Sequence, residues 1–345
     1  MATISIWHDV EDDDEELFAP PEHDPLGVLG STRWVVEQGE RVWINIDRVK
    51  LLSEQWAEED SAPQTPQWYD RYHFFDGTQR SVNWLLLLDA LNFCFWAEKG
   101  QPRWTIDYHG EKLNGYWAEA AALTRAVEEG LPLWDAEYLS TISEETMAHI
   151  FRGEQSIPLF EQRVANAREA GRVLLDHFDG QFSQAIEQAG GSAVALVLLL
   201  AERFPSFHDV ACYRQREVRF LKRAQICVAD LHGAFKGKSW GAFTGLEHLT
   251  AFADYKLPQV LRQYGVIEYQ ASLAAHVDAQ ELIAPGSEEE IEIRAATVWA
   301  CEMLRRALLK QGRSMTAPEI DQRLWFISQN LNEARPYHRT RTIYY

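Results

Sequence analysis

The sequence predicts a mostly α-helical protein built as a single helical domain, with little β-structure near its N-terminus. Apolar residues recur near the 3.6-residue helical period through most of the chain after residue 83. The segment 83–99 is apolar all round and stops at Gly100, as a buried helix with a glycine cap does. No repeat, low-complexity linker or composition change marks a boundary. We therefore expect one helical domain over residues 26–345, preceded by a lead-in over residues 1–25.

The lead-in is acidic and rich in proline. Residues 9–25 read DVEDDDEELFAPPEHDP, which is typical of a solvated segment, so we expect loose order there. A functional acidic tail is the less common alternative. The segments STRWVV and RVWINID that follow are rich in Trp, Val and Ile, and they indicate one short hairpin.

Helices are predicted for most of the remaining chain. Their apolar residues follow helical spacing, and SIPLFEQRV and SMTAPEI carry proline near a predicted first turn. Besides 83–99, the predicted helices cover 115–129, 159–177, 192–204, 215–235, 245–252, 258–264, 288–310 and 317–332.

The charge balance limits the classes of partner. Lys and Arg number 33 against 52 Asp and Glu, a formal charge of −19. A nucleic-acid polymer or an anionic membrane needs a basic surface, so we expect neither as a partner. A small charged ligand remains compatible, because net charge does not describe one pocket. Aromatic residues are 12% of the chain and include 13 Trp, which favours rings lining a pocket or an interface.

The cysteines and the N-terminus indicate a cytoplasmic protein. Its four cysteines (Cys94, Cys212, Cys227 and Cys301) are scattered among apolar residues without metal-ligand spacing, so we expect buried, reduced thiols, no structural zinc and no cofactor. The start MATISIWHDV lacks the features of a signal peptide, and the longest apolar run, AVALVLLLA, is too short to span a bilayer. We also expect a monomer.

Standard catalytic motifs are missing from the sequence. There is no GxGxxG, GxSxG or HExxH, and no paired His–carboxylate metal signature. GAFKGKS at residues 233–239 separates its glycines by three residues where a phosphate-binding loop needs four, so a surface loop is expected there.

Lys222 lies in a cationic part of a predicted helix, YRQREVRFLKRAQICVADLHGA. Its neighbours include Arg219 and Arg223. One interpretation is an exposed basic turn. The other is a partly buried lysine whose pKa is lowered by cationic neighbours, as catalytic lysines require.

Asp254 falls just before a predicted helix in LTAFADYKLPQVLRQYG. Pro258 suits the first turn of that helix and Gly265 its end. The positive helix end stabilises a carboxylate at this place as the anion. A simple N-cap is the common use of such an Asp, but Asp254 is early for a cap and is flanked by Phe252 and Tyr255. An ionised Asp beside aromatic faces is also what cleavage of a glycosidic bond needs.

Two further places carry polar groups in apolar surroundings. Asp89 and Asn92 lie three residues apart on one face of the helix predicted over 83–99. A buried Asp must be paired, and an Arg partner and a bound ligand are equally open. The terminal PYHRTRTIYY contains three tyrosines, so we expect it to dock against the core.

These stretches together resemble the queuosine salvage family, whose members are queuosine 5′-phosphate N-glycosylases. The matching segments run from about residue 83 to residue 345 in the family's order; FADYKLPQVL and KRAQ are the most specific. The others are NWLLLLDALNFCFW, the rest of YRQREVRFLKRAQICVADLHGAF, EIEIRAATVWACEML and HRTRTIYY.

The resemblance implies hydrolysis of queuosine 5′-monophosphate to queuine and ribose 5-phosphate, on a helical fold like that of helix-hairpin-helix DNA glycosylases. It places the family's catalytic Asp on Asp254 and its active-site Lys on Lys222. It also implies that Phe252 lies against the base and that His73 of RYHFFDG binds ligand.

Chemistry suggests roles for three more residues. Asp89 would accept N–H groups of the guanine-like edge, Arg223 would meet the phosphate with Lys222, and Tyr255 would contribute an aromatic face. A non-catalytic queuine-binding protein is the main alternative. A glycosylase that extrudes bases from nucleic acid is disfavoured by the charge.

Overall fold

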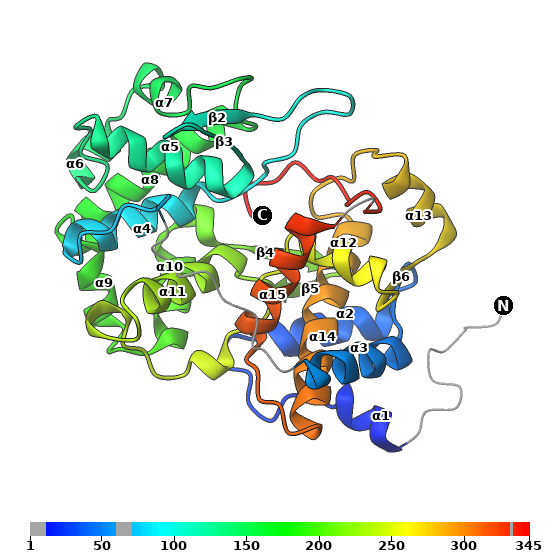
Figure 1. Cartoon of the computed structure of the whole chain (residues 1–345). Helices are drawn as coiled ribbons and strands as arrows, with labels where there is room; N and C mark the ends of the chain where they lie inside the picture. The colour runs from blue at the N-terminus through cyan, green and yellow to red at the C-terminus, as the bar shows by residue number, and fades with distance from the viewer. Residues whose placement is uncertain (1–11, 60–70, 332–333) are drawn as a thin grey trace. The chain divides into compact units, whose positions relative to one another are not determined.

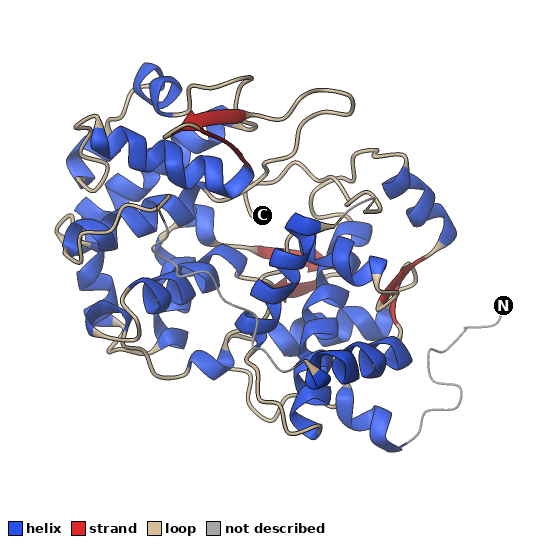
Figure 2. Ribbon diagram, viewed as in Figure 1, coloured by secondary structure: helices blue, strands red, loops and turns tan. Residues whose placement is uncertain are grey.

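The described part of the chain is predominantly helical. The computed structural model describes residues 12–59, 71–331 and 334–345, which form fifteen α-helices, three short 3-10 helices and six short strands. Figure 2 shows the helices in blue and the strands as short red segments. The predicted mostly helical class is therefore confirmed. No helix in these three ranges is long and apolar enough to cross a bilayer.

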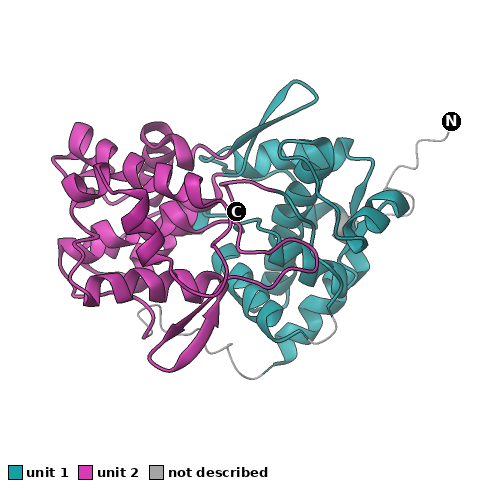
Figure 3. Cartoon of the chain, turned by 90° about the horizontal axis from the view of Figure 1, so that it is seen from above, with its two compact units in different colours: residues 1–65, 210–220, 247–340 teal, residues 66–209, 221–246, 341–345 magenta. Residues whose placement is uncertain are grey.

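The chain divides into two compact units (Figure 3). Among the described residues, unit 1 contains 12–59, 210–220, 247–331 and 334–340, and unit 2 contains 71–209, 221–246 and 341–345. Each unit is assembled from stretches that are far apart in the sequence. This explains why no change of composition along the chain marks a boundary.

Unit 1 is centred on a long helix, α14, which packs against α2, α3 and α15 (Figure 1). Its elements are α1 (Asp12–Leu17), α2 (Val28–Gln38), β1 (Val42–Ile44), α3 (Ile46–Glu58), β4 (Val210–Tyr213), β5 (Arg216–Arg219), α12 (Lys256–Gln263), β6 (Ile267–Tyr269), α13 (Ala271–Asp278), α14 (Glu288–Lys310) and α15 (Ala317–Asn330). The short helix η3 (Leu246–His248) begins one residue before the unit.

The described part of the lead-in is more ordered than its composition suggests. Residues 1–11 lie outside the described residues, but 12–17 form α1, and Leu17 and Phe18 are buried. The Phe18 ring packs edge-on against Trp299 of α14, with 4.6 Å between ring centroids. Two apolar residues at the end of an acidic run are therefore enough to attach it to the core of unit 1.

The hairpin expected near the N-terminus is wrong. STRWVV lies in α2, where Val28, Thr32 and Val35 follow helical spacing and are buried together. Part of RVWINID does form a strand, β1, but its antiparallel partner is the distant β6, with Trp43 opposite Glu268. Strand propensity was correct locally, whereas the choice of partner depended on tertiary packing.

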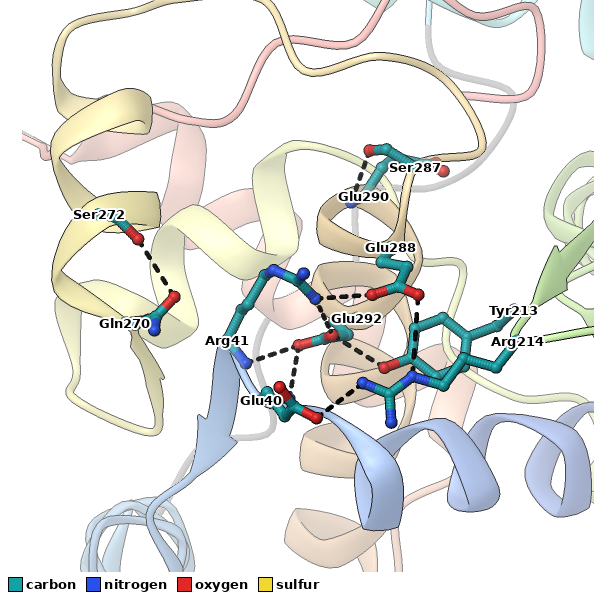
Figure 4. A network of polar contacts seen from close by, with 10 residues as sticks. All are labelled: Glu40, Arg41, Tyr213, Arg214, Gln270, Ser272, Ser287, Glu288, Glu290 and Glu292. Carbon is teal, nitrogen blue, oxygen red and sulfur yellow. Dashed lines mark hydrogen bonds and ion pairs between the residues drawn. The ribbon is translucent and has the colours of Figure 1, made fainter. Parts of the chain in front are cut away.

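A polar network fixes β1 and the β4–β5 hairpin to the start of α14 (Figure 4). Glu292, whose side chain is 1% exposed, accepts hydrogen bonds from the backbone N–H and guanidinium of Arg41 at 2.8 and 3.0 Å. It also accepts one from the Tyr213 hydroxyl at 2.9 Å. One buried carboxylate thus joins three elements that are distant in the sequence.

Unit 2 is built around α4, which packs against α8, α9 and α11. Its elements are α4 (Gln79–Leu91), β2 (Thr105–Tyr108), β3 (Glu111–Asn114), α5 (Gly115–Glu128), α6 (Ala136–Ser140), α7 (Glu144–Ile150), α8 (Phe160–Phe178), α9 (Phe182–Gln188), α10 (Ala193–Arg203), η1 (Pro205–Phe207), α11 (Lys222–Ala234) and η2 (Ser239–Gly241). From Ser81 to Leu91 every residue of α4 is buried, which confirms the predicted buried helix.

Helix α4 ends earlier than predicted, at Leu91 and not near Gly100. Side chains take the carbonyl groups that would continue the helix. Arg163 donates to the carbonyls of Leu91 and Phe93, and Asn166 donates to that of Ala90 at 2.9 Å. Helical continuation would compete with these buried, charge-assisted bonds.

The helix predicted over 215–235 begins later, at Lys222. Residues 210–219 instead form the β4–β5 hairpin, whose turn holds Arg214 and Gln215 at positive φ. Of the helix predicted over 245–252, only η3 forms. Six other predicted helices are confirmed, as α5, α8, α10, α12, α14 and α15.

The thiols and the terminal tyrosines give mixed outcomes. Cys94, Cys227 and Cys301 are buried as predicted, but Cys212 on β4 is exposed. Cys212 pairs with Glu217 of β5 in this two-stranded ribbon. Side chains on one face of such a ribbon point into solvent, which accounts for the exposed thiol. Docking of the final segment is confirmed within unit 2, where Tyr345 is 2% exposed and its carbonyl accepts the Cys94 N–H at 3.0 Å.

Candidate functional site

Asp254 is held at the N-terminus of α12 in unit 1. Its Oδ1 accepts the backbone N–H groups of Lys256 at 2.7 Å and Leu257 at 2.9 Å. Both belong to the first turn of the helix, and Pro258 completes that turn, as predicted. Two N–H donors and the positive helix end favour the carboxylate anion. The capping role and a chemical role are therefore compatible, because capping is what keeps the group charged and fixed.

The segment carrying Asp254 is fixed on both sides by charged residues of α14 and α15. The Phe252 N–H donates to Asp321 Oδ2 at 2.6 Å, and the Ala253 carbonyl accepts from Arg294 Nε at 3.3 Å. The Arg294 guanidinium lies 3.9 Å from the centre of the Phe220 ring. Sequence reasoning missed Asp321 and Arg294. Their signal was a charged residue on the buried face of a predicted helix.

Aromatic residues flank Asp254 within unit 1. Phe252 and Tyr255 are each 8% exposed, and the Tyr255 ring lies 4.9 Å from that of Tyr337. Cys301 of α14 is also close. Its burial, followed by the negative charges of Asp321, Glu302 and Asp254, raises the pKa of the thiol well above its ordinary value. Cys301 is therefore a neutral thiol beside this segment, unsuited to act as a nucleophile.

Lys222 is the first residue of α11 in unit 2. Leu221 adopts a left-handed conformation, with φ of 51°, and turns the chain into the helix. Asp209 caps this start, because its Oδ2 accepts the Lys222 N–H at 3.1 Å and its carbonyl accepts the Leu221 N–H. Lys222 is 5% exposed, so the exposed basic turn is excluded and burial is confirmed. Asp209 was missed by the sequence reasoning.

Acidic groups as well as Arg223 lie around Lys222. The positive charge of Lys222 acts on the carboxyls of Asp89 and Glu119. Burial raises the pKa of Glu119 to about 8, although its carboxylate lies 2.8 Å from the Arg163 guanidinium. The sequence predicted cationic neighbours for Lys222, and the structure adds acidic ones.

Asp89 is fully buried on α4, and its partner is a second carboxyl. Its side chain lies beside Asp230 and the thiol of Cys227, both on α11. Burial, then the charge of Asp230, raises the pKa of Asp89 well above the ordinary value. Of the two alternatives left open for Asp89, the arginine is present nearby, but Arg223 donates to the Asp89 backbone carbonyl at 3.1 Å and not to its side chain. Asn92 lies beyond the end of α4.

Arg223 holds backbone carbonyls together inside unit 2. Its guanidinium donates to the carbonyls of Asp89, Ala90 and Ser206, and it lies 5.1 Å from the Phe207 ring. Burial lowers the pKa of Arg223 to about 10, so it stays charged at neutral pH. These bonds give Arg223 a structural role, and its contact with a phosphate stays a prediction.

His73 lies in an aromatic cluster of unit 2. Its Nε2 is 2.9 Å from the Tyr116 hydroxyl, and its ring lies about 6 Å from those of Trp84 and Trp117. Tyr116 connects this cluster to the carboxyls, because burial and the charges of Asp230 and Asp89 raise its pKa well above 10. His73, Asp89, Lys222 and Arg223 are thus brought together in unit 2, and Phe252, Asp254 and Tyr255 are brought together in unit 1.

The two groups offer different chemistry. Unit 1 supplies a fixed carboxylate beside aromatic faces, which suits a developing positive charge. Unit 2 supplies a buried amine, two coupled carboxyls and aromatic rings, which suit a planar polar ligand. Across the described ranges, no group of three His, Cys, Asp or Glu side chains is arranged to hold a metal ion.

Comparison with known proteins places the same residues in a family. The profile described as queuosine salvage protein matches residues 72–345. A protein of Sphaerobacter thermophilus named queuosine 5′-phosphate N-glycosylase/hydrolase is 51% identical over 93% of this chain and 98% of its own length. Proteins of the same name from Mus musculus and Schizosaccharomyces pombe are 34% and 31% identical, over 93% and 90% of this chain and 99% of each of theirs. Because the matched region contains the residues of both groups, the chain belongs to the queuosine salvage protein family.

Proposed function

We propose that this chain is an N-glycosylase that hydrolyses queuosine 5′-monophosphate to queuine and ribose 5-phosphate. The names of its near-full-length relatives support the reaction and the substrate. The observation that carries the chemistry is the Asp254 carboxylate, fixed by two backbone N–H groups at the start of α12. We propose for the fold the helix-hairpin-helix glycosylase type, which the helical architecture supports.

Asp254 acts on the sugar side of the bond. As the C1′–N bond breaks, the ribose gains oxocarbenium character and a fixed carboxylate stabilises it. The same carboxylate orients the water that attacks C1′, and the hydrolysis needs no cofactor. An Asp that is already capped by the helix does not reorganise during the reaction, which is the property that electrostatic catalysis requires.

The remaining residues act on the base and the phosphate. Queuine is a 7-deazaguanine and lacks the N7 that purine glycosylases can protonate, so donors must meet charge on O6 and the ring nitrogens. We assign base contacts to Asp89, His73, Phe252 and Tyr255. Lys222 contacts the ribose or phosphate, with Arg223 as a second cation near it.

The proposal is tested by incubating the protein with queuosine 5′-monophosphate and detecting queuine by chromatography. Queuosine and its 3′-monophosphate serve as comparison substrates. Release of queuine above a heat-inactivated control supports the proposal. The absence of release from any of the three forms, with the protein folded by circular dichroism, would contradict it.

A binding protein for queuine is the second candidate, favoured by the aromatic cluster of His73, Tyr116, Trp84 and Trp117. Such a cluster holds a base with or without chemistry. Tight binding of queuine without turnover of any nucleotide form would select this candidate. In either case we propose a monomeric cytoplasmic protein that does not bind nucleic-acid polymers.

A further inference from the structure

The carboxyls of Asp89 and Asp230 face each other from two helices of unit 2. Arg223, Cys227 and Asp230 follow i, i+4, i+7 spacing and therefore lie on one face of α11. That face packs against α4, where Arg223 holds the Asp89 backbone and Cys227 and Asp230 lie beside its side chain. Asp230 was not among the residues that the sequence singled out.

Two neighbouring carboxyls on packed helices favour a state in which they share one proton. Asp89 is 0% exposed, and no nitrogen or hydroxyl donor of the described residues bonds either of its carboxylate oxygens. If both groups were ionised, they would repel each other, and burial of Asp89 leaves its charge poorly screened by solvent. Burial and the charge of Asp230 accordingly raise the pKa of Asp89. The pair then carries one negative charge, which the nearby Lys222 ammonium offsets.

A second observation points to a ligand in unit 2. The indole N–H of Trp84 is fully buried and has no acceptor among the described residues. The Trp84 ring lies 6.1 Å from that of His73, which hydrogen-bonds Tyr116, the phenol that the two carboxyls act on. A buried donor without a partner is costly unless a bound molecule satisfies it.

We propose that Asp89 and Asp230 share one proton at neutral pH and together recognise the guanine-like edge of the base, with Asp230 as the positioning residue that sets the protonation of Asp89. This inference rests on the proposed function. The edge offers one acceptor, O6, beside two donors, N1–H and the exocyclic amine. When the base binds, the O–H turns from the partner carboxylate to O6, and the free carboxylate oxygens accept N1–H and the exocyclic amine, which is the complementary set.

The shared proton also stabilises the departing base. When the C1′–N9 bond breaks, its electron pair moves onto the base and part of the charge reaches O6, where the O–H donates. Water supplies hydroxide to C1′ and its proton ends on the base nitrogen. The proton of the carboxyl pair remains with the pair, so the enzyme is unchanged after each turnover.

Loss of that proton at alkaline pH should weaken recognition. Tyr116 of α5 and Lys222, Arg223 and Cys227 of α11 interact with the pair. His73 contacts Tyr116, and Glu119 of α5 interacts with Lys222 and with Arg163 of α8. Among these, Glu119 titrates near pH 8 and must be separated from the pair. Glu119→Gln provides that separation.

The experiment is the pH profile of kcat/KM from neutral to alkaline pH for the wild type, Asp230→Asn, Glu119→Gln and the exposed Asp176→Asn. The side-chain amide that Asp230→Asn introduces keeps an N–H donor at every pH. We therefore expect Asp230→Asn to lower neutral kcat/KM about tenfold while moving the alkaline midpoint upward by about one pH unit or more. Asp176→Asn should follow the wild type. An unmoved midpoint in Asp230→Asn would overturn the proposal, as would a Glu119→Gln profile in which the alkaline loss disappears.

Two further measurements keep this result independent of turnover. Queuine binding, followed by quenching of tryptophan fluorescence, should show the same alkaline loss and the same shift in Asp230→Asn. If the wild type binds in this way but hydrolyses nothing, the proposed function fails and the inference stands. Infrared difference spectra of wild type and Asp230→Asn at neutral pH should show one protonated carboxyl without any ligand. A lack of that band would overturn the shared proton.

Discussion

Asp254 combines two duties that are usually separated. Its Oδ1 caps α12 through Lys256 and Leu257, and the proposed chemistry needs its charge. Removing the side chain would therefore disturb both the helix and the reaction. Substitution by Asn separates them, because an asparagine oxygen caps a helix about as well as a carboxylate does, but carries no charge.

We expect Asp254→Asn to abolish turnover, while its affinity for queuine stays within about tenfold of wild type and its thermal midpoint changes little. Asp254→Ala should lose turnover and, in addition, about 1 kcal/mol of stability with the cap. Single-turnover kinetics and thermal unfolding of both variants provide the test. Retained turnover in Asp254→Asn would move the catalytic charge to another residue.

Lys222 is the second residue whose role a substitution can resolve. We expect Lys222→Ala to lower kcat/KM by about two orders of magnitude or more, because the proposed ribose or phosphate contact and the charge opposite Asp89 are both lost. Steady-state kinetics with the 5′-monophosphate measures this loss. The exposed Lys112→Ala serves as the control. Near-normal kinetics in Lys222→Ala would leave this lysine only its charge interaction with Asp89.

At the level of helices and strands, sequence patterns located elements better than their ends. The buried face of α4 was predictable from composition, but its end at Leu91 depends on Arg163 and Asn166, which lie about 70 residues away. The start of α11 depends likewise on Asp209 and on the strained Leu221. Local propensity carries no information about such distant partners.

In the candidate site, too, local sequence predicted some residues, but it did not predict their partners from distant helices. Asp254 was predictable because a helix start is a local feature with a known preference for carboxylates. The partners that complete each group came from elsewhere: Asp321 and Arg294 lie on helices remote in sequence, and Asp230 meets Asp89 only because α11 packs on α4. Charged residues such as these also occur on solvated helix faces, so their spacing in the sequence did not show that they belong to the site.

Glu292 gives a prediction about how elements hold together in unit 1. It accepts bonds from Arg41 and Tyr213, and a glutamine cannot accept them all or balance the arginine charge. We expect Glu292→Gln to lower the free energy of unfolding by about 3 kcal/mol. Urea unfolding measures the change. The exposed Glu54→Gln on α3 should stay within about 0.5 kcal/mol of wild type, and an equally small effect for Glu292→Gln would refute the role of the network.

For the molecule as a whole, one buried histidine makes the free energy of unfolding fall as the pH is lowered. Burial, reinforced by the positive charge of Arg294, lowers the pKa of His338 from 6.5 to about 3. Between these values the unfolded chain binds a proton that the folded protein does not. Stability from this residue is therefore complete above pH 6.5 and is lost as pH falls toward 3.

In His338→Gln the unfolded chain no longer binds the proton that His338 takes up on unfolding. We expect its unfolding free energy to fall less steeply between pH 6.5 and pH 5 than that of the wild type, by up to about 1.4 kcal/mol per pH unit. Urea midpoints measured at several pH values supply both slopes. Parallel slopes would show that His338 does not control acid stability, whatever the variant costs at neutral pH.

The way the chain is shared between the two units also affects how the protein is made. Unit 1 draws on residues up to 340, and unit 2 includes 341–345, where the Tyr345 carbonyl accepts the Cys94 N–H. A nascent chain therefore cannot complete either unit until residues beyond 333 have been translated, since both units include residues of that stretch. The ribosome must carry α4, with its buried carboxyl and apolar faces, until α11, which packs on it, has emerged. Chaperone dependence and yield should thus change more on loss of residues 341–345 than the small size of that segment suggests.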